Sequence, residues 1–76
     1  MSNLAITQRI LARNKSVIQD LENHIEYFRI RKHEADEAGR LEDEYYYHDL
    51  LKVYKVELVK YVKEQRYLKQ LAKEVV

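Results

Sequence analysis

Apolar residues recur every seven positions along the first half of the chain. They form two rows, which alternate at spacings of three and four residues, as in a helix with one apolar stripe. One row consists of Leu4, Leu11, Ile18, Ile25 and Lys32, and the other of Thr7, Asn14, Leu21, Phe28 and Ala35. This spacing predicts a long, coiled-coil-like helix over about residues 4–37.

The second half of the chain repeats the pattern in a different phase. Its rows are Leu51, Leu58, Gln65 and Ala72, and Tyr47, Tyr54, Tyr61, Leu68 and Val75. The step from Lys32 to Leu51 is nineteen residues, whereas an unbroken heptad pattern needs fourteen or twenty-one. We therefore expect two helices with an interruption between them.

The single glycine marks this interruption. Gly39 can adopt the left-handed conformation that commonly ends a helix, so we expect a turn over about residues 38–41 and a second helix over about 42–75. Folding there sets Leu21 against Leu58, and Asn14 against Gln65 as a polar pair of the kind that fixes register at some cost in stability. The sequence thus predicts an all-α, antiparallel two-helix hairpin that forms a single domain over residues 1–76.

Two other arrangements fit parts of the pattern. A continuous helix of about 100 Å that dimerises as a rod is conceivable, because a glycine costs a helix interior only about 1 kcal/mol. The change of phase disfavours it. A β-strand over residues 52–62 suits the β-branched residues there, but the apolar positions do not alternate as a half-buried strand requires.

Apolar residues outside the rows predict a second layer of helices. A two-helix hairpin has one internal seam, so a further stripe needs a further partner. We expect an antiparallel homodimer that forms a four-helix bundle. Its expected interface contains Ile10, Val17, Leu50, Val53, Val56, Val59 and Val62. Charge favours antiparallel packing, because residues 33–49 carry seven acidic residues and one basic residue, a charge of −6, and the remainder carries +7.

Composition narrows the chemistry further. The 76 residues include one glycine and neither cysteine nor proline, which excludes disulfides and cysteine metal sites and suits long helices. The chain lacks the apolar run of a signal peptide or of a transmembrane helix. We expect a cytoplasmic protein without a membrane partner.

No residue pattern typical of an enzyme is present. We find no nucleophile with a nearby base and no glycine-rich phosphate loop, and a single seam leaves little room for a substrate. Glu44 with His48, and His33 with Glu37, have the spacing of neighbours on a helix, but solvated ion pairs explain them better than a metal site. We expect no catalytic residue, cofactor, metal ion or small-molecule substrate.

Two surfaces are candidates for a macromolecular partner. Tyr45, Tyr46 and Tyr47 cannot all face the seam, because a helix turns about 100° per residue. Tyr45 and Tyr46, with Glu42 and Asp43, predict a protein-binding site near the turn. The other surface is basic and predicts nucleic-acid binding. It consists of Lys52, Lys55, Lys60, Lys63 and Arg66.

The function expected first is that of a non-enzymatic interaction protein that binds and regulates a protein partner. Chains of this size and kind suit regulators of phage, viral or plasmid origin. A nucleic-acid-binding, RNA-binding regulator is the alternative, and a structural or assembly subunit is a second. The expected architecture resembles that of a plasmid regulator that binds RNA as a dimer of helical hairpins, a likeness that concerns the fold alone.

Overall fold

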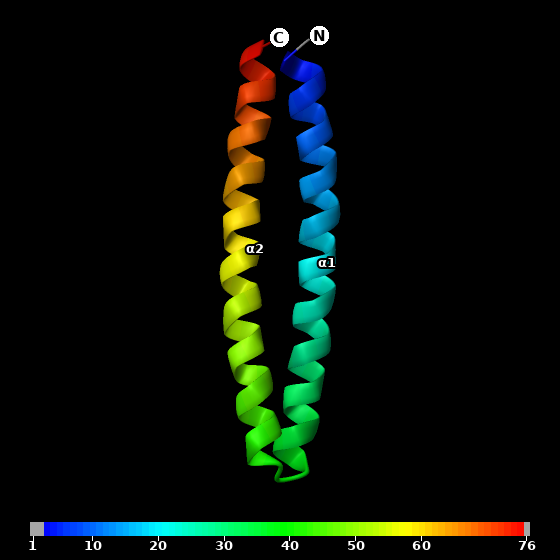
Figure 1. Ribbon diagram of the computed structural model, residues 1–76, viewed down its shortest axis with the longest axis vertical. Helices are drawn as coiled ribbons and strands as arrows, with labels where there is room; N and C mark the ends of the chain where they lie inside the picture. Colours follow the sequence, from blue (N-terminus) through cyan, green and yellow to red (C-terminus); the bar gives the residue numbers. More distant parts are fainter. Residues whose placement is uncertain (1–2, 76) are drawn as a thin grey trace.

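The computed structural model describes residues 3–75 and consists of two long antiparallel helices. Helix α1 spans Asn3–Glu37 and α2 spans Leu41–Val75, with 35 residues in each. The helices lie side by side, and the start of α1 and the end of α2 meet at one end of the molecule (Figure 1). The Cα atoms extend over 56 × 14 × 14 Å. The predicted helical hairpin is confirmed, and the described residues form neither a continuous rod nor a strand.

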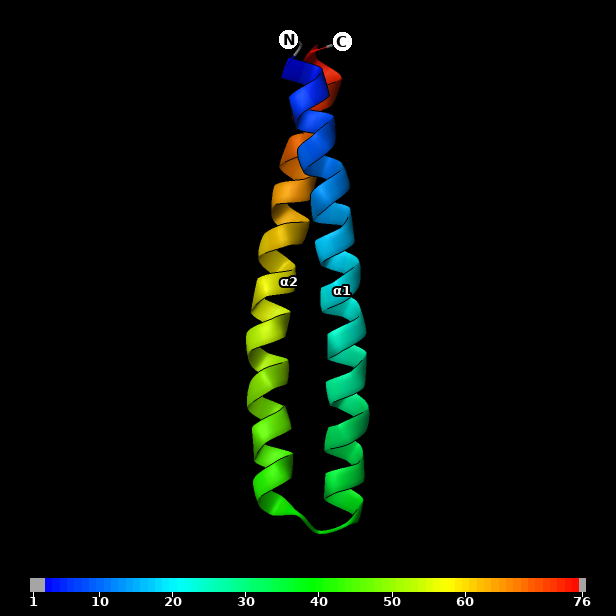
Figure 2. The same ribbon diagram turned by 45° about the vertical axis from the view of Figure 1, so that its right-hand side comes forward.

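The two helices also wind around each other. The ribbons overlap near the chain ends in Figure 2 but stand apart near the turn, whereas in Figure 1 they stand apart near the chain ends. The plane that contains both helix axes therefore rotates along the molecule. A straight helix would carry a seven-residue pattern away from its partner by about 20° per heptad, and the winding cancels this drift.

The turn closes both helices with backbone hydrogen bonds. Gly39 has a φ of 71°. The Arg40 amide donates to the Ala35 carbonyl at 2.9 Å and the Gly39 amide to the Asp36 carbonyl at 3.1 Å, which together make a Schellman motif. The Arg40 carbonyl in turn accepts from the Glu44 amide at 3.0 Å and so begins α2. Arg40 takes part both in the hydrogen bonds that end α1 and in the one that begins α2, so every residue of the connection is held by a backbone hydrogen bond.

The seam between the helices is built from the predicted rows. Every row residue with a described side chain is buried or half-buried, while the side chain of Val75 lies outside the described part. Among the described apolar side chains only Ala35, Leu51 and Leu68 are buried. So small a core supports a chain of this length only marginally.

Aromatic rings fill the seam in the half near the turn. The Phe28 ring centroid lies 5.0 Å from that of Tyr54 at an interplanar angle of 79°, and 6.1 Å from that of Tyr47. Tyr46 packs edge-on against Tyr47 at 5.3 Å, an orientation that aromatic pairs favour. The three consecutive tyrosines are therefore divided: Tyr47 lies in the seam, Tyr46 packs on it, and Tyr45 is exposed.

One layer of the seam is polar. Asn14 is only 2% exposed, and the Gln65 Nε2 group donates to the Leu11 carbonyl at 2.9 Å. The Asn14 Nδ2 and Gln65 Oε1 atoms are buried without a hydrogen-bond partner. Because a buried polar group without a partner costs about 1–3 kcal/mol, this layer lowers the stability of the hairpin.

Replacing Gly39 with alanine tests the turn. A Cβ added there would meet no atom within 4 Å, so the cost is conformational alone. We expect the free energy of unfolding to fall by about 1–2 kcal/mol, measured by urea unfolding with far-UV circular dichroism. Gly39→Asn is the matched control and should lose less, since asparagine enters the left-handed region more readily. Equal stability of all three proteins would contradict the role given to the glycine.

Replacing Asn14 with leucine tests the polar layer. The change removes a buried amide that has an unpaired N–H group, so the free energy of unfolding should rise by about 1–3 kcal/mol in the same assay. Gln65→Leu should gain less, because it also removes the hydrogen bond to the Leu11 carbonyl. A loss of stability in Asn14→Leu would show that the amide is satisfied in solution.

Candidate nucleic-acid interface

The hairpin has two broad faces of different character. Each row of seam residues has neighbours in the chain that flank the seam. In an antiparallel pair, the residue directly after each member of the Thr7 row of α1 and of the Tyr47 row of α2 lies on one side of the seam. The residue directly before each member of the Leu4 row and of the Leu51 row lies on the other side. On α2 the first set is His48, Lys55, Val62 and Lys69. The second set is Leu50, Glu57, Glu64 and Leu71. One side is therefore basic, and the other is apolar and acidic.

Further basic residues of α2 extend the first side. Lys52, Arg66 and Lys73 stand three or four residues from the set that contains Lys55 and Lys69, so they lie next to it on the helix surface. We call this surface the basic face. Its residues are His48, Lys52, Lys55, Arg66, Lys69 and Lys73.

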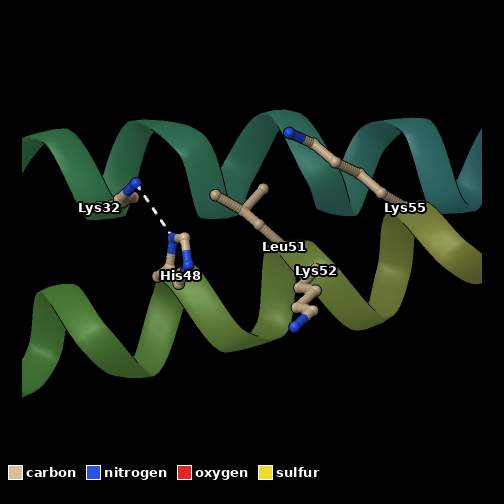
Figure 3. Close-up of a pocket in the computed structure, with 5 residues that line it drawn as sticks. All are labelled: Lys32, His48, Leu51, Lys52 and Lys55. Atoms are coloured by element: carbon tan, nitrogen blue, oxygen red, sulfur yellow. Dashed lines mark hydrogen bonds between the residues drawn. The ribbon is translucent and has the colours of Figure 1, made fainter.

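Two lysine-lined grooves accompany the basic face. The first has a volume of about 380 Å³ and is lined by Lys32, His48, Leu51, Lys52 and Lys55 (Figure 3). The second lies nearer the chain ends, has a volume of about 420 Å³ and is lined by Leu11, Ala12, Lys15, Ile18, Gln65 and Lys69. Neither lining contains an acidic residue, so the lysines of each groove are not neutralised within the groove itself.

The cationic groups of the first groove spread apart rather than converge. Lys32 reaches from α1 toward His48, with its Nζ 3.4 Å from Nδ1 (Figure 3). Because an ammonium group can only donate, His48 accepts through Nδ1 in this contact. Lys55 extends across α1 whereas Lys52 points the opposite way (Figure 3). Cations spread in this way suit successive charges along a polymer better than one small anion.

No acidic residue interrupts the basic face along α2, but Val59 and Val62 lie within it and separate His48, Lys52 and Lys55 from Arg66, Lys69 and Lys73 by about 16 Å. At about 100° per residue the residues of the basic face fall within an arc of about 100°, and α2 advances about 32 Å from Lys52 to Lys73. Glu57 and Glu64 lie on the opposite side of the helix by the same rotation. The strip is therefore about as long as one turn of a nucleic-acid duplex.

The fold separates the five residues predicted to bind nucleic acid. The basic face contains Lys52, Lys55 and Arg66. Lys63 lies beside this face and lines a shallow groove on the outside of α2 together with Lys55 and Lys60. Lys60 lies off the basic face, and its Nζ forms an ion pair with Glu57 Oε1 at 3.2 Å. Sequence reasoning missed Lys15 and Lys32, which come from α1 and reach the grooves only through the pairing of the helices.

Acidic residues on this side of the seam come from α1. By the pairing of the helices Glu26 lies at the level of Lys52 and Lys55, Glu22 lies one helical turn farther from the connection, and Asp36 lies near the turn. Arg29 Nη2 lies 2.8 Å from Glu26 Oε2 and offsets that charge. The cations on this side of the seam come mainly from α2.

Three of the residues predicted to bind a protein near the turn, Glu42, Tyr45 and Tyr46, fall within an arc of about 100° around α2. Tyr45 and Tyr46 are 64% and 60% exposed. Glu42 and Asp43 stand in the first turn of α2, where carboxylates interact favourably with the helix dipole, and Asp43 lies 3.8 Å from Arg40. These two acids thus have a role in the fold. Tyr45 precedes Lys52 by one heptad and so stands at the end of the basic face.

Other titratable side chains form local contacts. His33 Nε2 lies 3.0 Å from Glu37 Oε1, and His24 Nδ1 lies 2.7 Å from the Asp20 carbonyl. Within residues 3–75 no three histidine or carboxylate side chains are placed to hold a metal ion. The neighbouring Tyr47 side chain raises the pKa of Arg31, whose guanidinium lies 6.0 Å from the ring centroid. These contacts link neighbouring side chains of the hairpin.

No known protein or family indicates a function for this chain. Comparisons with protein-family models, with curated proteins and with solved structures found no match. Neither α1 nor α2, as far as the structure describes them, contains a segment long and apolar enough to cross a membrane.

Proposed function

We propose that the protein is a non-enzymatic interaction protein that binds nucleic acid through its basic face. The observation that supports this most is the strip of α2 cations that runs past two lysine-lined grooves free of acidic residues. A chain of phosphates needs cations spaced along a line, and release of its counterions supplies most of the free energy of binding. The basic face offers two groups of cations along a line of about 32 Å, with Val59 and Val62 between them.

The chemistry of the face favours phosphate contacts over the reading of bases. Lysine ammonium groups on flexible stems bind phosphates as point charges and carry little sequence information. Tyr45 stands exposed at the end of the strip nearest the turn, where its ring can stack on an unpaired base. The proposed ligand is therefore RNA or DNA recognised by charge and shape, with added affinity for unpaired bases.

A protein partner at the turn is the second candidate function. The exposure of Tyr45 and Tyr46 favours it, because a tyrosine buries a large ring at an interface and still satisfies its hydroxyl in water. The basic face is preferred because Glu42 and Asp43 already interact with the α2 terminus.

Salt-dependent binding tests the proposal. Fluorescence anisotropy with a labelled RNA hairpin and a labelled DNA duplex should show that log K falls linearly with log salt, with a slope of about −4 for four or five phosphate contacts. The double variant Lys52→Gln with Lys55→Gln should weaken binding and make the slope shallower by about 2. Circular dichroism should show that this variant keeps its helices.

A matched control removes the same charge elsewhere. Arg9 and Lys60 are exposed and lie off the basic face, so Arg9→Gln with Lys60→Gln should bind nearly as tightly as the unaltered protein. An equal loss in both double variants would mean that bulk charge, not the basic face, attracts the probe. If neither probe binds even at low salt, the proposal is wrong and the protein-partner hypothesis takes its place.

A further inference from the structure

The side of the hairpin opposite the basic face is rich in apolar side chains. Beside the seam lie Ile10, Val17, Leu50 and Leu71, which are half-buried. Farther out on α2, Val53 and Tyr67 are 58% and 64% exposed. We call these six residues the apolar face. On α2 three charged residues, Glu57, Lys60 and Glu64, separate its apolar side chains into two groups. Exposed apolar groups gathered on one side of a small protein indicate an interaction site.

The chain exposes more surface than a compact protein of its mass. Its accessible surface is 6112 Å² for 9.3 kDa, whereas a folded monomer of that mass exposes about 5,000 Å². The Cα extents of 56 by 14 Å give the face an area of about 800 Å². A stable dimer buries about 800 Å² per partner, so one further hairpin laid on this face would remove most of the excess.

The α2 residues on the side of the apolar face have a nearly symmetric order about Lys60. From Leu50 to Leu71 the order is Leu50, Val53, Glu57, Lys60, Glu64, Tyr67 and Leu71, with Lys60 at the centre. Two antiparallel copies of α2 that cross at Lys60 would set Leu50 against Leu71 and Val53 against Tyr67. Each Lys60 would face the Lys60 of the other copy, and the glutamates of that copy would lie about one helical turn to either side of it.

The distribution of charge agrees with this orientation. Residues 33–49 around the turn carry −6 and the rest of the chain carries +7. Antiparallel copies place each acidic turn beside the basic open end of the other, whereas parallel copies bring two acidic turns together. Within a Debye length of about 8–10 Å such charges are not fully screened, so they select the antiparallel pair.

We infer that a second copy of the chain covers the apolar face in antiparallel orientation and completes a four-helix bundle. Each copy then presents its basic face outward, on opposite sides of the bundle. The dimer itself does not depend on nucleic-acid binding. If both hold, one dimer offers two binding surfaces.

This interface differs in part from the one that the sequence pattern predicts. It keeps Ile10, Val17, Leu50 and Val53 but excludes three valines farther along α2, namely Val56, Val59 and Val62. Between Val53 and Val62 the helix makes two and a half turns, about 900°, so these two side chains lie on opposite sides of α2. Val56 and Val59 lie among Lys55, Lys60 and Lys63 on the outside of α2.

Sedimentation equilibrium with a matched pair of variants tests the inference. The unaltered protein should have twice the mass of the 9.3 kDa chain at micromolar concentration. Val53→Glu should raise the dissociation constant at least tenfold, because it buries a charge in the interface. Val56→Glu should leave it unchanged, although Val53 and Val56 are similarly exposed, at 58% and 52%. A monomeric mass for the unaltered protein, or equal effects of both variants, would overturn the inference.

Cross-linking tests the orientation. The chain contains no cysteine, so Lys60→Cys introduces a single thiol at the proposed crossing point. Mild oxidation should link two copies through it, and Val56→Cys should link poorly. A dimer in which Lys60→Cys does not cross-link would rule out the antiparallel crossing. Loss of nucleic-acid binding on removal of Lys52 and Lys55 would not change the mass, so the two proposals fail independently.

Discussion

The turn at Gly39 is the constraint on which the rest of the structure depends. The hydrogen bonds that end α1 and the one that begins α2 share Arg40, so α2 cannot slide along α1 without breaking one of them. This connection sets Phe28 against Tyr54 and Tyr47 in the seam. The polar layer at Asn14 and Gln65 carries a cost in stability, because two of its buried polar atoms have no hydrogen-bond partner. Its contribution to register stays a prediction.

Two helices enclose a single seam, and this limit explains the surface. With few side chains buried, most of each helix faces outward, and the two sides of the seam have diverged in chemistry. Cations of α2 gather on one side, while leucine, valine, isoleucine and tyrosine gather on the other. Because the sides are opposite, the proposed nucleic-acid surface and the proposed dimer interface do not overlap.

The basic face is unlike an enzyme site in its geometry. Its lysines point in different directions and its grooves are shallow, so no point on it concentrates several groups on one reacting atom. The same dispersion suits a ligand whose charges repeat. Under the proposed function, affinity comes from many weak contacts that are sensitive to salt.

The heptad pattern and the single glycine determined by themselves the two helices, the turn and the seam, because periodicity and backbone conformation are local properties. Tertiary structure decided which flanks share a side. Lys15 joins Lys69 in one groove, and Lys32 joins Lys52 and Lys55 in another, only because the helices are antiparallel in this register. The ion pair of Lys60 with Glu57 and the spread of the valines around α2 are instead local, since both follow from residue spacing on a single helix that turns about 100° per residue.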